Sequence, residues 1–125
     1  MTATALPHHE TAGSGPAVVL VHAGICDGRM WDPQWRSLAA DHRVVRLDLR
    51  GFGRSPLPPD VFAHARDVLD VMDAAGVDRA ALVGASMGGR VVLEAAVAAP
   101  QRVTALVLAG AGLPGHDWSQ DVRDY

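Results

Sequence analysis

Ser86 stands in the segment Gly84-Ala85-Ser86-Met87-Gly88, with glycines two residues before and two residues after it. A serine hydroxyl is a weak nucleophile by itself, so it needs a histidine as general base and a carboxylate that orients the histidine. Small residues on both sides allow a sharp turn from a strand into a helix, which projects the hydroxyl into a cleft. The pattern therefore makes Ser86 a candidate nucleophile.

The residue after this serine is placed to supply a second part of the same chemistry. If a helix begins at Met87, its N–H group lies at the helix N-terminus, where donors and dipole favour a developing oxyanion. The alternative interpretation is that Gly84, Gly88 and Gly89 only let a helix pack closely on a strand. The position of the motif, between a buried strand and a helix, favours the nucleophile.

The elements that must position this serine can be read from the apolar runs of the chain. Four short runs rich in aliphatic residues are typical of strands, and they lie at 17–22, 43–49, 80–85 and 103–109. Because these runs are nearly continuous rather than alternating, we expect both faces of the strands to be buried, as in a parallel sheet. The third run leads directly into the turn that carries the serine.

Helical spacing of apolar residues fills the intervals between the strands. Pro33 is placed to open a short helix at its first turn. A longer helix is predicted from about Val61 to a stop at Gly76, with Asp67 largely on its polar face. A third helix is predicted over 87–99.

Alternating strands and helices predict an α/β fold in a single domain over residues 1–125. We expect a doubly wound, mainly parallel sheet with helices on both faces and right-handed crossovers. In such sheets, ligands bind beyond the carboxyl ends of the strands. The loops at 23–32 and 50–60 leave from those ends, so they are the expected walls of a site.

Composition excludes several classes of partner. The 125 residues carry a net charge of −3, and the basic residues form no cluster that would attract nucleic acid or an anionic membrane. There is no signal-peptide pattern, and no apolar run reaches the length of about 18 residues that a membrane span requires. Cys26 is the single cysteine and cannot form an internal disulfide, so a cytoplasmic location is expected.

Three other sets of side chains have a chemical interpretation. His116 and Asp117 follow the last predicted strand and could form a base and acid pair, although a surface segment is the favoured interpretation. Cys26 has no neighbouring motif that would activate its thiol. His8 and His9 lack the spacing of metal ligands, and no metal site is predicted elsewhere.

Three segments together resemble the α/β-hydrolase superfamily in their order and position. They are Val19-Leu20-Val21-His22-Ala23-Gly24, Asp48-Leu49-Arg50-Gly51-Phe52-Gly53-Arg54-Ser55, and the turn from Gly84 to Gly88. The resemblance runs from about Glu10 to the end of the chain.

This resemblance implies a structural part for each segment. The first is similar to a strand followed by His-Gly, whose loop supplies an oxyanion donor. The N–H group of Gly24 would be that donor, with Ala23 standing where the family usually has glycine. His22 would hold this loop rather than act as base. The second segment would shape the floor of the site without being catalytic, with Asp48 and Arg50 forming hydrogen bonds inside a buried turn.

The implied activity is that of a serine hydrolase. Such an enzyme would form an acyl-enzyme on Ser86 with an ester, a lactone or a related carbonyl compound. The oxyanion would lie between the N–H groups of Gly24 and Met87. No cofactor is required, and the expected partner is a small-molecule carbonyl substrate.

The resemblance also implies that part of the catalytic machinery is missing. In the family the acid and the histidine follow later strands than those predicted here, so the chain resembles an N-terminal half. Loss of the histidine from a serine triad can cost on the order of a million-fold in turnover. We therefore expect the chain alone to be nearly inactive, and a catalytically inactive fragment or a binding module remains the alternative. The strand at 103–109 would form an exposed sheet edge, through which self-association is possible.

Overall fold

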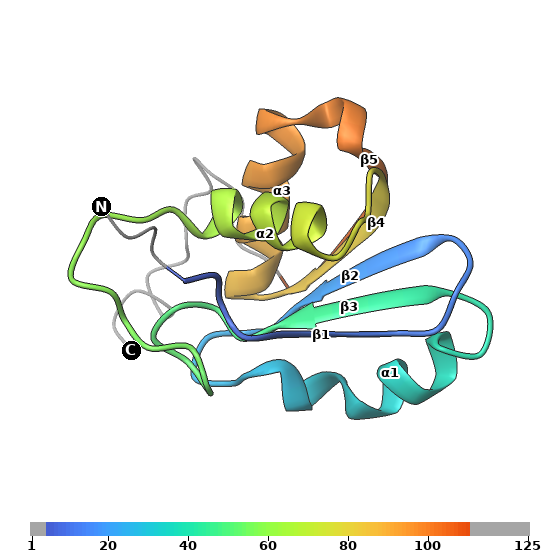
Figure 1. Ribbon diagram of the computed structural model, residues 1–125, viewed down its shortest axis with the longest axis horizontal. Helices are drawn as coiled ribbons and strands as arrows, with labels where there is room; N and C mark the ends of the chain where they lie inside the picture. Colours follow the sequence, from blue (N-terminus) through green and yellow to red (C-terminus); the bar gives the residue numbers. More distant parts are fainter. Residues whose placement is uncertain (1–4, 111–125) are drawn as a thin grey trace, which may run out of the picture.

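The computed structural model describes residues 5–110, which form a five-stranded sheet with helices on both faces (Figure 1). The strands are β1 (His9–Ala12), β2 (Ala17–Val21), β3 (Arg43–Leu47), β4 (Ala80–Ala85) and β5 (Val103–Ala109). Their order across the sheet is β1-β3-β2-β4-β5. Strands β2 to β5 are parallel to their neighbours, whereas β1 runs antiparallel to β3. The predicted α/β fold with a mainly parallel sheet is confirmed.

Within the described residues, three α-helices and two short 3-10 segments connect the strands. They are α1 (Asp32–Leu38), α2 (His64–Ala74), α3 (Met87–Ala98), η1 (Gly28–Trp31) and η2 (Pro100–Arg102). Figure 1 shows α1 on one side of the sheet and α2 with α3 on the other, so the sheet is doubly wound as predicted. None of these helices is long and apolar enough to cross a membrane.

The side chains of β2 divide between two apolar layers. Val18 and Leu20 pack in the layer that includes Trp35 of α1, and Val19 and Val21 belong to the larger layer beneath α2 and α3. Successive side chains of a strand point to opposite faces, so a strand that is covered on both faces must be apolar at every position. This accounts for the unbroken apolar run of β2, whereas no residue of the equally apolar β5 is buried within the described part of the chain.

Strand β2 is also the point from which the chain winds in two directions. Its neighbours are β3 on one side and β4 on the other. The connection through α1 covers one face, and the connection through α2 covers the other. Loops that leave such a switch point diverge and form a crevice at the carboxyl ends of the strands. The loop after β2 and the turn after β4 meet there.

Strand β1 is an element that the sequence did not predict. Its four residues pair with β3, from His9 opposite Leu47 to Ala12 opposite Val44. Three of the four are polar, and none is fully buried. A strand that is so short and polar resembles a loop in the sequence, and only its pairing with β3 in the structure identifies it as a strand.

The second helix begins later than its apolar pattern indicates. Helix α2 starts at His64 rather than near Val61, and the Val61 side chain is fully exposed. The backbone is still extended at Ala63, so Val61 belongs to the preceding loop. Gly76 has a φ of +70° just after the helix, as expected for a glycine that ends a helix.

Asp67 lies in the interior, which corrects its predicted place on the polar face of this helix. Its Oδ2 and Oδ1 accept hydrogen bonds of 2.7 and 3.1 Å from Nε and Nη2 of Arg50. Both residues are buried. The helical spacing of apolar residues predicts that charged side chains face solvent. It cannot reveal that Arg50, from the loop after β3, would pair with Asp67 in the interior.

Strand β5 forms one edge of the described sheet. It pairs with β4 from Val103 to Ala109, with an irregularity in register at Thr104, and the first backbone N–H beyond β4, that of Ser86, also donates to the Ala109 carbonyl at 2.8 Å. Val107 is half exposed. The expected sheet edge at 103–109 is therefore present within residues 5–110, and self-association through it stays a prediction.

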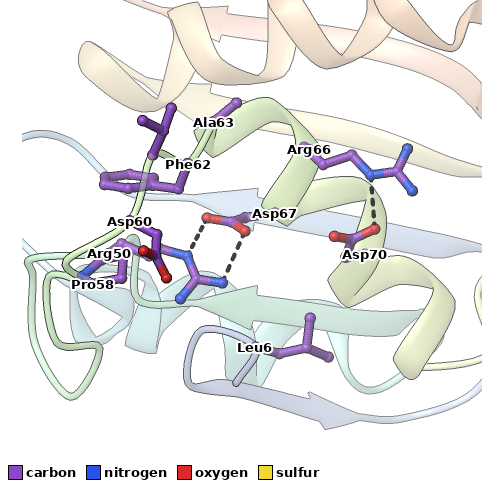
Figure 2. A pocket seen from close by; sticks show the side chains of 10 residues that line it. Leu6, Arg50, Pro58, Asp60, Phe62, Ala63, Arg66, Asp67 and Asp70 are labelled. Atoms are coloured by element: carbon purple, nitrogen blue, oxygen red, sulfur yellow. Dashed lines mark hydrogen bonds and ion pairs between the residues drawn. The ribbon is translucent and has the colours of Figure 1, made fainter. Parts of the chain in front are cut away.

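Replacing Asp67 by alanine is expected to lower the free energy of unfolding by about 3–5 kcal/mol, because Arg50 would be left buried without its counter-charge. The matched control is Asp70→Ala on the same helix, where the partner is the exposed Arg66 at 3.1 Å. Figure 2 shows both pairs. The control should cost less than about 1 kcal/mol. Urea unfolding measures the loss of stability in both variants. Equal losses would contradict a larger contribution from the buried Arg50–Asp67 pair than from the exposed Arg66–Asp70 pair.

Candidate active site

Ser86 joins β4 to α3 in a backbone conformation that few residues with a side chain adopt. Its φ is +51° and its ψ is −112°, and the residue is exposed. A serine that precedes a helix usually has an extended backbone, and its oxygen accepts an N–H from the first turn. The Ser86 side chain makes no such capping bond. The structure therefore leaves the hydroxyl outside the helix, where a ligand can reach it.

Glycines on both sides of the serine make this turn possible. A Cβ atom on Gly84 would lie 2.2 Å from the Gly88 carbonyl oxygen. One on Gly88 would lie 2.2 Å from the carbonyl oxygen of Val21 and 2.5 Å from that of His22. Real Cβ atoms are not found at such distances from backbone atoms, so both positions require glycine. The first turn of α3 therefore lies against the end of β2. The same glycines allow this close packing and the turn that exposes the serine, so the two interpretations of the glycines are compatible.

This packing brings Gly24 beside Met87. A Cβ atom on Gly24 would lie 3.5 Å from the Met87 Sδ. Met87 is the first residue of α3, and the first N–H groups of a helix have no partner within it. Within residues 5–110, the Gly24 N–H donates to no other group. The two residues predicted to supply the oxyanion donors are therefore neighbours, with Gly24 beside the Met87 side chain.

The loop that carries Gly24 is held in a strained turn. The Cys26 N–H donates to the Ala23 carbonyl at 3.2 Å, and Ile25 has a φ of +59° with its side chain almost completely exposed. A β-branched residue is rare in this conformation. Ala23 donates its N–H to the Met30 Sδ at 3.3 Å. The strain at Ile25 gives no signal in the sequence, because it arises from the path of the loop.

His22 is fully buried, and both of its ring nitrogens are used within the fold. Nε2 accepts the Leu49 N–H at 2.8 Å, so the ring hydrogen is on Nδ1, which lies 2.7 Å from the Ala23 carbonyl oxygen. A neutral imidazole with both nitrogens occupied has no acceptor left for the proton of Ser86. The contacts of His22 are those of a residue that holds a loop.

No histidine within residues 5–110 forms a hydrogen bond with the Ser86 hydroxyl. His64 is the one with a perturbed proton affinity, since burial lowers the pKa of its ring. Its Nδ1 is buried without a hydrogen-bond partner among the described residues, and its ring packs edge-on against Phe62. His8, His9 and His42 contact Arg54, the Pro7 carbonyl and Asp41 respectively.

Asp27, in the loop after β2, is paired with its neighbour. Its Oδ1 accepts the Arg29 backbone N–H at 2.9 Å, and its Oδ2 lies 2.8 Å from the Arg29 Nη2. Hydrogen bonds from the Arg29 side chain and backbone hold the pKa of Asp27 at about 2. The carboxyl group therefore stays ionised and begins η1, and it does not supply a proton to a neighbouring group.

The remaining candidates do not add to the site. Cys26 is a free, partly exposed thiol. His116 and Asp117 lie outside the described residues. Within residues 5–110, no group of three metal-ligating side chains comes together.

A cavity of about 450 Å³ lies between the loop after β3 and the start of α2 (Figure 2). Arg50 and Asp67 form part of its wall, and Phe62 closes one side. Neither Ser86 nor Gly24 is among its lining residues. This cavity is therefore separate from the serine, whose surroundings are the open carboxyl ends of β2 and β4.

Replacing Ser86 by glycine is expected to give a more stable protein than replacing it by alanine, by about 1 kcal/mol or more. The reason is that backbone strain of this kind costs about 1–3 kcal/mol and needs a Cβ atom. The matched pair is Ser37→Gly and Ser37→Ala, at an exposed position of α1, where alanine should be more stable by about 1 kcal/mol. Urea midpoints measure the stability of the four variants. If alanine were more stable than glycine at position 86 as well as at position 37, the result would contradict backbone strain at Ser86.

Acidification is expected to destabilise the wild type more than His64→Gln. The folded protein lowers the pKa of His64, so the unfolded chain binds the proton more readily and stability falls as pH drops below about 6.5. Urea midpoints at pH 7.5 and pH 5.5 would measure the two slopes. Equal pH dependence in the two proteins would contradict the prediction.

Comparison with known proteins places this geometry in a family. Residues 16–125 match the family described as alpha/beta hydrolase fold. A 2-hydroxy-6-oxo-6-phenylhexa-2,4-dienoate hydrolase of Comamonas testosteroni is 36% identical over 115 residues, which cover 86% of this chain and 40% of that enzyme. The chain spans about 40% of the length of the curated relatives it matches.

Solved structures agree with this assignment. The enol-lactonase from Burkholderia xenovorans LB400 superimposes with a TM-score of 0.73 at 32% identity, over 79% of this chain and 41% of its own. Est816, described as an N-acyl homoserine lactone degrading enzyme, superimposes with a TM-score of 0.80 at 33% identity, over 84% of this chain and 42% of its own. From its sequence and its fold, this chain belongs to the α/β-hydrolase fold family.

Proposed function

We propose that this chain carries the nucleophile and the oxyanion-binding part of a serine hydrolase. Ser86 attacks the carbonyl carbon of an ester, a lactone or a related compound and forms an acyl-enzyme, which water then hydrolyses. The reaction is acyl transfer, and its groups are a serine hydroxyl and backbone amides, so it requires no cofactor.

The observation that carries the proposal is the conformation of Ser86. The residue has a positive φ, stays exposed and does not cap the helix that it precedes. A serine retained only for local structure has no need of this conformation, because glycine would fit it with less strain. The hydroxyl is the reactive group that glycine would not provide, and its exposure at the carboxyl end of β4 fits a nucleophile.

The two neighbouring amides provide the second part of the chemistry. As the oxygen of the substrate carbonyl acquires negative charge, the N–H groups of Gly24 and Met87 would donate to it. Each such donor contributes about 10²–10³-fold to turnover in serine hydrolases, because it is already oriented before the reaction. The α3 dipole adds to the same effect at Met87.

The relatives support the carbonyl substrate class. Their printed descriptions include a dienoate hydrolase, an enol-lactonase and an N-acyl homoserine lactone degrading enzyme. Each of these compounds contains a carbonyl group that a nucleophile can attack. We extend this class to the chain because the serine turn lies within the matched segment.

The base and the acid are expected outside residues 5–110, either further along the protein or on another chain. Within the described part, both nitrogens of His22 are occupied and no other histidine contacts the Ser86 hydroxyl. This observation also favours a second candidate function, a binding module that keeps the crevice without catalysis. The two functions differ in whether Ser86 reacts.

In the whole protein or in a complex with a second chain, where the base is expected, Ser86 should react covalently with a fluorophosphonate probe, and mass spectrometry of the labelled peptide locates the site. Ser86→Ala should abolish labelling, and Ser37→Ala, at an exposed serine on α1, should leave it unchanged. A folded whole protein that is not labelled, in any assembly state, would contradict the hydrolase and favour the binding module. Size-exclusion chromatography of the same sample tests self-association through β5, and labelling confined to an oligomer would assign the base to a second chain.

A further inference from the structure

Asp48 follows β3 and is a buried carboxylate that forms no ion pair within residues 5–110. Its Oδ1 accepts the Gly28 N–H at 2.7 Å, and its Oδ2 accepts the Arg54 backbone N–H at 2.9 Å. An ionised carboxylate in such a place is stabilised by charge-assisted hydrogen bonds to backbone amides. Because these two amides belong to different loops, the side chain links the loop after β2 to the loop after β3.

The chain makes room for this carboxylate with two glycines. A Cβ atom on Gly28 would lie 3.1 Å from Oδ1 of Asp48, and one on Gly53 would lie 2.4 Å from Oδ2. Gly53 also has a φ of +52°. Both backbones therefore approach the carboxylate more closely than a residue with a side chain easily allows.

A second link lies at the other end of the same loop. The Leu49 N–H donates to His22 Nε2 at 2.8 Å, and His22 Nδ1 contacts the Ala23 carbonyl at 2.7 Å. Residues 48 and 49 thus hold the segment 22–28 at both of its ends.

Gly24 lies between these two links, beside the strained Ile25. A turn with a positive φ at a β-branched residue persists only where its surroundings hold it. Ile25 has almost no contacts of its own, since its side chain is exposed. Besides the hydrogen bonds of the Ala23 and Cys26 N–H groups, the restraint on the turn comes from its ends, at His22 and Gly28.

We infer that Asp48 is a positioning residue, whose hydrogen bond to Gly28 keeps the Gly24 N–H aligned with that of Met87 as an oxyanion donor. The inference rests on the proposed function for its effect on Ser86. Its effect on the loop is independent of that function. Asp48 itself touches no substrate.

The test compares Asp48→Asn with Asp67→Asn in the full chain. Asparagine has the shape of aspartate, but its amide group presents a donor to one of the two backbone N–H groups. Asp67 is the matched control, because it is equally buried yet pairs with the Arg50 side chain rather than with loop amides. Both variants are compared per folded molecule, with the folded fraction taken from urea unfolding.

Two readouts are expected to change in Asp48→Asn and not in Asp67→Asn. The maximal rate of covalent labelling of Ser86 by the fluorophosphonate should fall on the order of tenfold or more, with little change in the half-saturating probe concentration, since a misplaced oxyanion donor affects the transition state. Hydrogen exchange of the amides at 23–28 should become faster. Because labelling is compared per folded molecule, a stability defect alone would slow it in neither variant.

Unchanged exchange at 23–28 in a folded Asp48→Asn protein would overturn the inference, and so would labelling as fast as in the wild type. If the wild-type whole protein is not labelled, the proposed function fails, and exchange alone decides whether Asp48 positions the loop. If Asp48→Asn does not fold, amide hydrogen exchange of the wild type, measured by NMR, tests the link instead. The Gly28 and Arg54 amides must then be protected from exchange, and fast exchange of the Gly28 amide would overturn the link.

Discussion

The first turn of α3 lies directly against the carboxyl end of β2, and this contact depends on the absence of two Cβ atoms. Gly88 faces the carbonyl oxygens of Val21 and His22, and Gly84 faces the Gly88 carbonyl. Backbone atoms cannot move aside as the end of a flexible side chain can. Any larger residue would therefore push α3 away from the sheet, and the serine at its start would move with it.

Two consequences of this contact meet at the same place. The chain can enter α3 only through the positive φ of Ser86, which turns the hydroxyl outward. The same approach sets Met87 beside Gly24. The candidate nucleophile and the candidate oxyanion donors are thus positioned by one packing contact between a helix and a strand.

The loop after β2 depends in turn on the end of β3. The side chains of Asp48 and His22 accept hydrogen bonds from backbone N–H groups of neighbouring loops. Arg50, two residues after Asp48, pairs with Asp67 of α2. Buried polar groups of this kind are costly unless each has a partner. The start of the segment 48–55 therefore supports the loop after β2 through Asp48 and Leu49, and Arg50 separately ties the segment to α2.

The sequence by itself determined the sheet strands β2 to β5, the helices and the turn at Ser86, because these depend on local rules. A doubly covered strand must be apolar throughout, and a sharp turn into a helix needs small residues. It did not reveal β1, the late start of α2, the burial of Asp67 or the strain at Ile25. Only the tertiary structure decided these, because each depends on a partner distant in sequence, whether a neighbouring strand, a cation from another loop or a link at both ends of a turn.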